Sequence, residues 1–143
     1  MTTDATPRDA WLTLLLAPGV GPVTGMRLLQ AYGSAAAALA AGPSGWTRAG
    51  VPEALHAGLR QPDAAAMARC QAWLDAPQRA LISLDDPHYP QRLLEIPRPP
   101  LALFCLGDVS LLTRDQLAVV GARAASRQGL EHARSFSGEI ART

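Results

Sequence analysis

The stretch from residue 121 to residue 129 combines residue types that bind anions. Gly121 follows an apolar run and allows the backbone a tight exit, while free amides and the Ser126 hydroxyl face the start of the next predicted helix. Arg123 and Arg127 add positive charge, and a guanidinium can hold a phosphate through two parallel hydrogen bonds. Together with Gly129, these residues form a predicted phosphate-binding loop.

The spacing within this loop argues against two common nucleotide sites. Its glycines are eight residues apart, unlike the G-x-G-x-x-G dinucleotide fingerprint, and no Gly-Lys-Ser/Thr sequence is present. We therefore predict no bound cofactor. The competing interpretation is an ordinary turn between a strand and a helix, in which the glycines only permit the backbone geometry.

A second candidate phosphate contact lies in the turn of residues 18–22, whose sequence is PGVGP. Two helices joined by such a turn form a helix-hairpin-helix, in which the backbone near Gly19, Gly21 and Thr24 meets the positive end of the second helix. This arrangement can hold a DNA phosphate without reading base sequence. Alternatively, the hairpin only packs helices or contacts a protein. This alternative stays open because Arg27 is the one basic residue near the hairpin in the sequence.

The polar residues at 85–90 are better explained by a turn than by catalysis. Asp85, Asp86 and His88 are metal-ligand types, but neighbouring side chains at a strand end point apart and no further ligand spacing follows. We expect Tyr89 to be a buried anchor. No metal site and no catalytic residue is predicted, and two isolated histidines are assigned to packing or to the surface: His56 and His132.

The elements that position these residues change in character near residue 77. Apolar periodicity and Pro, Gly and Ser boundaries predict short helices at 7–17, 22–32, 35–41, 52–59 and 63–76. Strands are predicted at 80–84, 101–106 and 117–120, with short helical segments between them and a helix from Ser126 onward. The chain is thus predicted to be α/β overall, with an all-α domain over 1–77 and the first part of an α/β domain with buried strands over 78–143.

Composition excludes several classes of protein. The 143 residues are 48% hydrophobic and 17% charged with a formal net charge of +1, which indicates a globular chain and not a strongly basic one. All basic residues are arginine. We expect Cys70 and Cys105 to be reduced and buried, and predict neither a signal peptide nor a membrane span. Only 22 residues follow Gly121, so we also expect the chain to be a piece of a longer protein.

Two linked blocks of residues resemble the DNA-processing protein A family, DprA or Smf. The blocks are Tyr89-Pro90-x-x-Leu93-x-x-Ile96-x-x-Pro99-Pro100, reaching Gly107, and Leu117-Ala118-Val119-Val120-Gly121-Ala122-Arg123-x-x-Ser126-x-x-Gly129. The PGVGP hairpin and Tyr32-Gly33-Ser34 also fit this family. The resemblance implies a SAM-like helical domain followed by an extended Rossmann-type parallel α/β domain. It covers the chain from about Trp11 to the end, with one departure: Gln128 stands where the family often has an aromatic residue.

The resemblance also implies a function. Family members bind and protect single-stranded DNA, help to load the RecA recombinase during natural transformation, act as dimers in the cytoplasm and need no known catalytic cofactor. It assigns Gly121, Arg123, Ser126 and Gly129 to the loop that meets DNA phosphate. Two alternatives remain open: a Rossmann-type nucleotide-processing enzyme of the phosphoribohydrolase kind, and a helical module that docks a protein.

Overall fold

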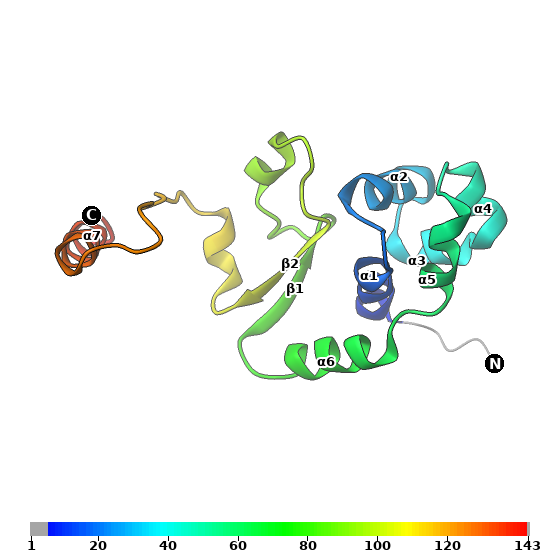
Figure 1. Cartoon of the computed structure of the whole chain (residues 1–143), viewed down its shortest axis with the longest axis horizontal. Coiled ribbons are helices and arrows are strands. Elements are labelled where there is room, and N and C mark those ends of the chain that lie inside the picture. Colours follow the sequence, from blue (N-terminus) through cyan, green and yellow to red (C-terminus); the bar gives the residue numbers. More distant parts are fainter. Residues whose placement is uncertain (1–5, 143) are drawn as a thin grey trace. The chain divides into compact units, whose positions relative to one another are not determined.

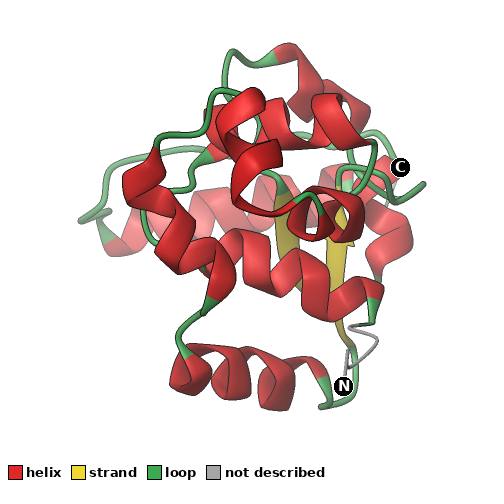
Figure 2. Cartoon of the chain, turned by 90° about the vertical axis from the view of Figure 1, so that its right-hand side faces the viewer, coloured by secondary structure: helices red, strands yellow, loops and turns green. Residues whose placement is uncertain are grey.

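The computed structural model describes residues 6–142, which divide into two compact units. The first unit ends at Thr113 and the second begins at Arg114. Figure 1 labels the helices and strands along the chain, and Figure 2 shows that helices make up most of the regular structure.

The first unit opens with a series of short helices whose starts follow directly from the sequence. Side chains of Thr6, Ser34 and Asp63 each accept a hydrogen bond from a first-turn amide and so cap a helix. Proline stands at the start of others, where its missing N–H costs nothing. The helices are α1 (Pro7–Leu16), α2 (Pro22–Tyr32), α3 (Ala35–Ala40), α4 (Gly42–Arg48), η1 (Glu53–Leu55), α5 (His56–Arg60) and α6 (Ala64–Leu74).

The predicted helices are confirmed, with one omission. The sequence predicts no helix between residues 41 and 52, but a further helix, α4, begins at Gly42. Proline is well tolerated in the first turn of a helix, so the same residue that ends one helix starts the next. Helix α4 carries Trp46, which is 2% exposed and donates its indole N–H to the Ala38 carbonyl at 2.7 Å.

The hydrophobic core joins these helices to the segment that follows them. Trp11, Leu14 and Leu28 contribute its centre, and Leu101 from beyond the helices packs into the same cluster. Gly25 makes this approach possible, because a Cβ atom there would lie 2.1 Å from the Leu101 Cδ1 atom. The predicted division between residues 77 and 78 stays a prediction about domains, but the core itself continues across that point.

Two strands form the β region of the first unit. Strand β1 (Arg79–Ser83) pairs with β2 (Ala102–Leu106), with Leu81 opposite Phe104, and the Leu84 amide extends the pairing to the Leu101 carbonyl. The pairing is antiparallel, so the expected parallel arrangement is wrong for these strands. A parallel pair needs a crossover, usually a full α-helix, whereas residues 84–101 hold only the short helix η2 (Gln91–Glu95) and fold back.

The β region is held against α6 by aromatic contacts. The Trp73 and Phe104 rings meet edge to face with centroids 5.7 Å apart, and the Arg79 guanidinium lies 4.9 Å from the Trp73 ring centroid. A third short helix, η3 (Val109–Thr113), follows β2 and completes the unit.

The second unit contains one regular element, helix α7 (Arg127–Ile140), within the described residues 114–142. The predicted strand at 117–120 is wrong for this structure, because these residues are exposed and irregular. A strand requires a hydrogen-bonded neighbour, and the described part of this unit supplies no second strand. The chain is therefore a helical region followed by a small two-stranded region, with α7 standing in a unit of its own.

Candidate nucleic-acid interface

The start of α7 is organised by the serine that the sequence singled out. Ser126 has extended backbone angles and its Oγ atom accepts a hydrogen bond from the Gly129 amide at 3.1 Å. Because this bond uses the hydroxyl as an acceptor, its proton can still be donated to an anion. The amides of Arg127 and Gln128 open the helix and have no acceptor within it. The helix start thus offers several donors to one anion.

Gly129 also has a local reason to be glycine. A Cβ atom at this position would lie 3.3 Å from the Ser126 Oγ atom, which is tighter than an ordinary contact. Gly121 differs, because a Cβ atom there would have no heavy atom within 4 Å and its backbone does not have a positive φ. The space beside Gly121 is therefore open to an approaching ligand.

The two arginines of this loop are both accessible. Arg123 lies in an exposed turn, and the Arg127 side chain is 95% exposed. The Arg127 Nε atom lies 3.5 Å from the Glu131 Oε1 atom one helical turn away, an exposed pair that solvent screens strongly. Both guanidinium groups can turn toward a phosphate. The structure thus places Gly121, Arg123, Ser126, Arg127 and Gly129 within one exposed loop and helix start.

The hairpin of residues 17–24 is built into the first unit. Gly19 has φ +78°, and a Cβ atom there would lie 2.6 Å from the Leu55 Cδ2 atom. Gly21 precedes α2 without a side-chain cap, so the amides of Val23 and Thr24 lack an acceptor within the helix. The predicted helix-hairpin-helix geometry is confirmed, and its phosphate contact through Gly19, Gly21 and Thr24 stays a prediction.

The charge near this hairpin differs from what the sequence indicated. The Arg27 Nη1 atom donates a hydrogen bond to the Gly50 carbonyl at 2.7 Å, which anchors that side chain. A second arginine, Arg98, lines a pocket together with Arg27, Pro22 and Val23. Sequence reasoning missed Arg98 because more than seventy residues separate it from the hairpin. No local pattern could have found it, since the fold of residues 84–101 brings it there.

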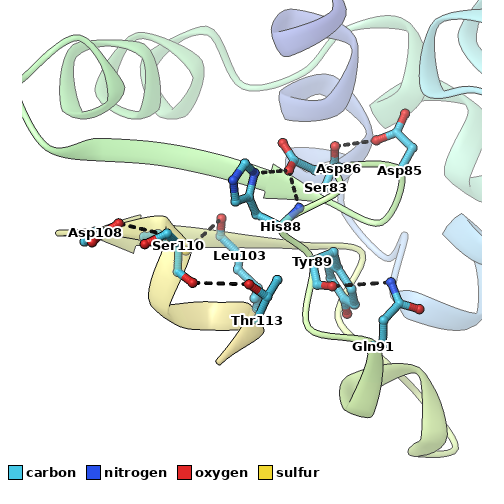
Figure 3. Close-up of polar contacts among 11 residues, drawn as sticks. Ser83, Asp85, Asp86, His88, Tyr89, Gln91, Leu103, Asp108, Ser110 and Thr113 are labelled. Carbon is cyan, nitrogen blue, oxygen red and sulfur yellow. Dashed lines mark hydrogen bonds and ion pairs between the residues drawn. The ribbon is translucent and has the colours of Figure 1, made fainter. Parts of the chain in front are cut away.

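The residues between β1 and η2 form the turn that the sequence predicted (Figure 3). Asp86 accepts from the His88 amide at 2.8 Å and lies 3.1 Å from the His88 Nδ1 atom, while the Ser83 hydroxyl donates to Asp85. Tyr89 is fully buried and donates its hydroxyl to the Pro100 carbonyl at 2.6 Å, so its predicted role as an anchor is confirmed. Burial raises the pKa of this hydroxyl. Among residues 6–142, no three potential metal ligands gather.

The remaining histidines and cysteines lie in the core, in partly buried positions or at the surface. His56 is buried against the Trp46 ring and its Nε2 atom lies 3.2 Å from the Val51 carbonyl, whereas His132 is exposed. Cys70 and Cys105 are free thiols, and both are half-buried where full burial was expected. Burial, with Asp86 as a smaller contribution, raises the pKa of the Cys105 thiol and so disfavours its nucleophilic form.

Comparison with known proteins connects both regions to one family. Residues 6–69 match the DprA-like N-terminal HHH domain, and residues 80–143 match the family of DNA recombination-mediator protein A. The chain is also 42% identical over 69 residues to Protein Smf of Escherichia coli strain K12. That match covers 48% of this chain and 18% of the relative's length. The search of solved structures gave no significant match.

The two family matches lie in the expected order and together span most of the sequence. The chain belongs to the DprA/Smf family, the DNA recombination mediators, and covers its helix-hairpin-helix domain and the start of its DprA domain. In the described residues, no helix is long and apolar enough to cross a membrane.

Proposed function

We propose that this chain binds single-stranded DNA without sequence preference, through the loop and helix start of residues 121–129. The observation that carries the proposal is the exposure of Arg123 and Arg127 beside the first-turn amides that the Ser126 cap leaves free. Such donors follow a phosphate backbone and make no contact with base edges. The family's role in DNA recombination supports the same ligand.

The hairpin would add a second phosphate contact within the same proposal. The amides of Val23 and Thr24 are available at the positive end of α2, and the packing of Gly19 against Leu55 holds the turn in place. The hairpin and the loop belong to separate compact units. A flexible single strand can contact both without a fixed arrangement of the two units.

The wider role follows from the family and is equally part of the proposal. We infer that the protein works in the cytoplasm as a dimer, protects incoming single strands and helps to load RecA, as a binding protein and not as an enzyme. We further propose that the residues from 78 onward form part of an extended Rossmann-type domain. Within the described residues, the functional part of that domain is the phosphate loop.

A salt titration of fluorescent oligo-dT binding tests the DNA proposal, with duplex DNA of equal length as the competitor. We expect preference for the single strand, affinity that falls as salt rises, and a loss of about threefold to tenfold for Arg123→Ala. Arg134→Ala is the matched control, because Arg134 is an exposed arginine in the middle of α7 and its loss changes the net charge equally. Equal losses of affinity in both variants would show that any arginine contributes equally and that the loop is not a specific contact. No binding of oligo-dT by the native chain would refute the proposal.

A further inference from the structure

Two pockets line up along one side of helix α2 in the first unit. One has a volume of about 370 Å³ and lies between α2 and the proline-rich segment at 97–99. The other has a volume of about 290 Å³ and lies between α2 and the residues around Leu84 and Leu94. Met26 and Gln30 line both pockets. The two hollows therefore adjoin each other along α2, and together they are here called the α2 groove.

The length of the groove limits what it can hold. Its lining runs along α2 from Pro22 to Gly33, and a rise of 1.5 Å per helical residue makes this about 16 Å. An extended peptide advances about 3.3 Å per residue, so the groove accommodates four or five residues. This is the scale of a short linear segment and not of a folded surface.

The end of the groove near Leu94 is apolar. Its walls include Met26, Leu29, Leu84 and Leu94, and the Leu94 side chain is exposed although it is large and hydrophobic, with 42% of its surface accessible. Trp11 also lines this pocket and is only 6% exposed, so its ring does not offer an open face for stacking. Aliphatic walls over a buried indole suit a leucine or phenylalanine side chain better than a nucleobase, which stacks on open aromatic faces.

The two ends of the groove carry opposite charge. Arg27 and Arg98 stand at the end near Pro22, and Arg27 is held in place by its hydrogen bond to the Gly50 carbonyl. Asp85 stands at the apolar end and is exposed. A DNA strand carries one negative charge per nucleotide and would be repelled by Asp85. A peptide can place a carboxylate at the arginines and an uncharged or basic residue near Asp85.

We propose that the α2 groove binds a short segment of a partner protein, with an acidic side chain on Arg27 and Arg98 and a large apolar side chain beside Leu29 and Leu94. The arginine pair selects the carboxylate, because a guanidinium donates two parallel hydrogen bonds to it. The apolar pocket supplies the anchor that short linear segments require. This docking function uses none of the residues of the 121–129 loop, whereas Pro22 and Val23, which follow the hairpin turn, line one end of the groove.

Fluorescence anisotropy with two labelled hexapeptides tests the inference on the full chain. The first peptide is Gly-Asp-Asp-Leu-Phe-Gly, and the second replaces both aspartates with lysine. We expect saturable binding of the acidic peptide and at least tenfold weaker binding of the basic one. Arg98→Glu should weaken binding of the acidic peptide about tenfold, and Leu94→Gln should weaken the same binding about fivefold.

Arg92→Glu is the matched control for Arg98→Glu. Arg92 is also exposed and lies on η2, and it lines neither pocket. The Arg92→Glu variant should bind the acidic peptide with an affinity within twofold of the native chain. Circular dichroism should show that each variant keeps its helical content. Equal losses from Arg92→Glu and Arg98→Glu would overturn the proposal, as would equal affinity for the two peptides or no binding of either.

Oligo-dT forms the second arm of the experiment and separates peptide from nucleic acid. If Arg98→Glu weakens oligo-dT binding and the acidic peptide does not compete with oligo-dT, the groove is a DNA contact and the peptide proposal fails. If the acidic peptide binds while Arg123→Ala leaves oligo-dT binding unchanged, the docking proposal stands and the phosphate-loop proposal fails. The two proposals can therefore fail independently.

Discussion

The hairpin of residues 17–24 and the loop of residues 121–129 offer similar backbone chemistry on different supports. In the hairpin, Gly19 is fixed at φ +78° with Leu55 beside it, and Gly58 lies against Pro18 from another helix. In the loop, Gly121 has open space around it, and the Ser126 cap holds the start of the helix. Tertiary packing thus orders one proposed phosphate contact, whereas local bonding orders the other.

The same contrast holds for the helices that follow each turn. Leu28 of α2 is fully buried, whereas Leu130, Phe136 and Ile140 of α7 are exposed large hydrophobic residues. Helix α2 is therefore stabilised by the core of the first unit. Helix α7 depends on its own capping and side-chain pairs in the described residues, so it is the more sensitive of the two to local changes.

Paired leucine truncations should give the largest difference between the two regions. Leu28→Ala removes a buried side chain and leaves a cavity, so we expect a loss of about 3 kcal/mol in the free energy of unfolding. Leu130→Ala should change it by less than about 0.5 kcal/mol, because the side chain is 47% exposed. Urea denaturation followed by circular dichroism measures both, and similar losses would show that α7 shares the core.

Glycine substitutions should separate the two turns by a smaller amount. Gly19→Ala forces a side chain into a positive-φ position and toward Leu55, so we expect a loss of about 1 kcal/mol. Gly121→Ala meets no neighbouring atom and should leave stability unchanged. Thermal unfolding of the two variants tests the difference. A destabilising Gly121→Ala variant would reveal packing around the loop that the exposed residues do not indicate.

Removing the helix caps should produce effects of similar size but different reach. Ser34→Ala removes a cap from a helix that packs into the core, so about 1 kcal/mol of global stability should be lost. Ser126→Ala should instead increase amide hydrogen exchange in the first turns of α7 and leave the unfolding of the first unit unchanged. If Ser126→Ala lowers global stability as much as Ser34→Ala does, the effect of the Ser126 cap is not confined to α7.

The smallest effect is expected from a pH-dependent contact between α1 and α6. Hydrogen bonds from the Thr6 hydroxyl and the Gln71 amide hold the pKa of Asp9 below its usual value of 3.8. The carboxylate therefore contributes stability above that value, and this contribution disappears as pH falls through the lowered pKa of the folded protein. The difference in unfolding free energy between the native chain and Asp9→Asn should shrink from about pH 6 to about pH 2.5. A difference in unfolding free energy that stays constant with pH would show that the charge of the Asp9 carboxylate does not contribute to stability.

The sequence by itself determined most of the local structure. Proline at helix starts, serine caps and apolar periodicity located the predicted helices, because the first turn of a helix uses only neighbouring residues. The turn around Tyr89 and the hairpin were predictable for the same reason. The Ser126 cap also depends on a contact only three residues long. The residues proposed to bind phosphate come from the same kind of local pattern.

Only the tertiary structure decided how distant segments meet. Strand direction was mispredicted because an apolar run looks the same in a parallel and an antiparallel pair, and the fold of residues 84–101 sets the direction. Residues 117–120 have a strand-like pattern, but a strand forms only where a neighbour supplies hydrogen bonds. The α2 groove depends on Arg98 and Leu94 reaching α2 from far along the chain. Such contacts depend on packing in three dimensions, which local sequence patterns do not encode.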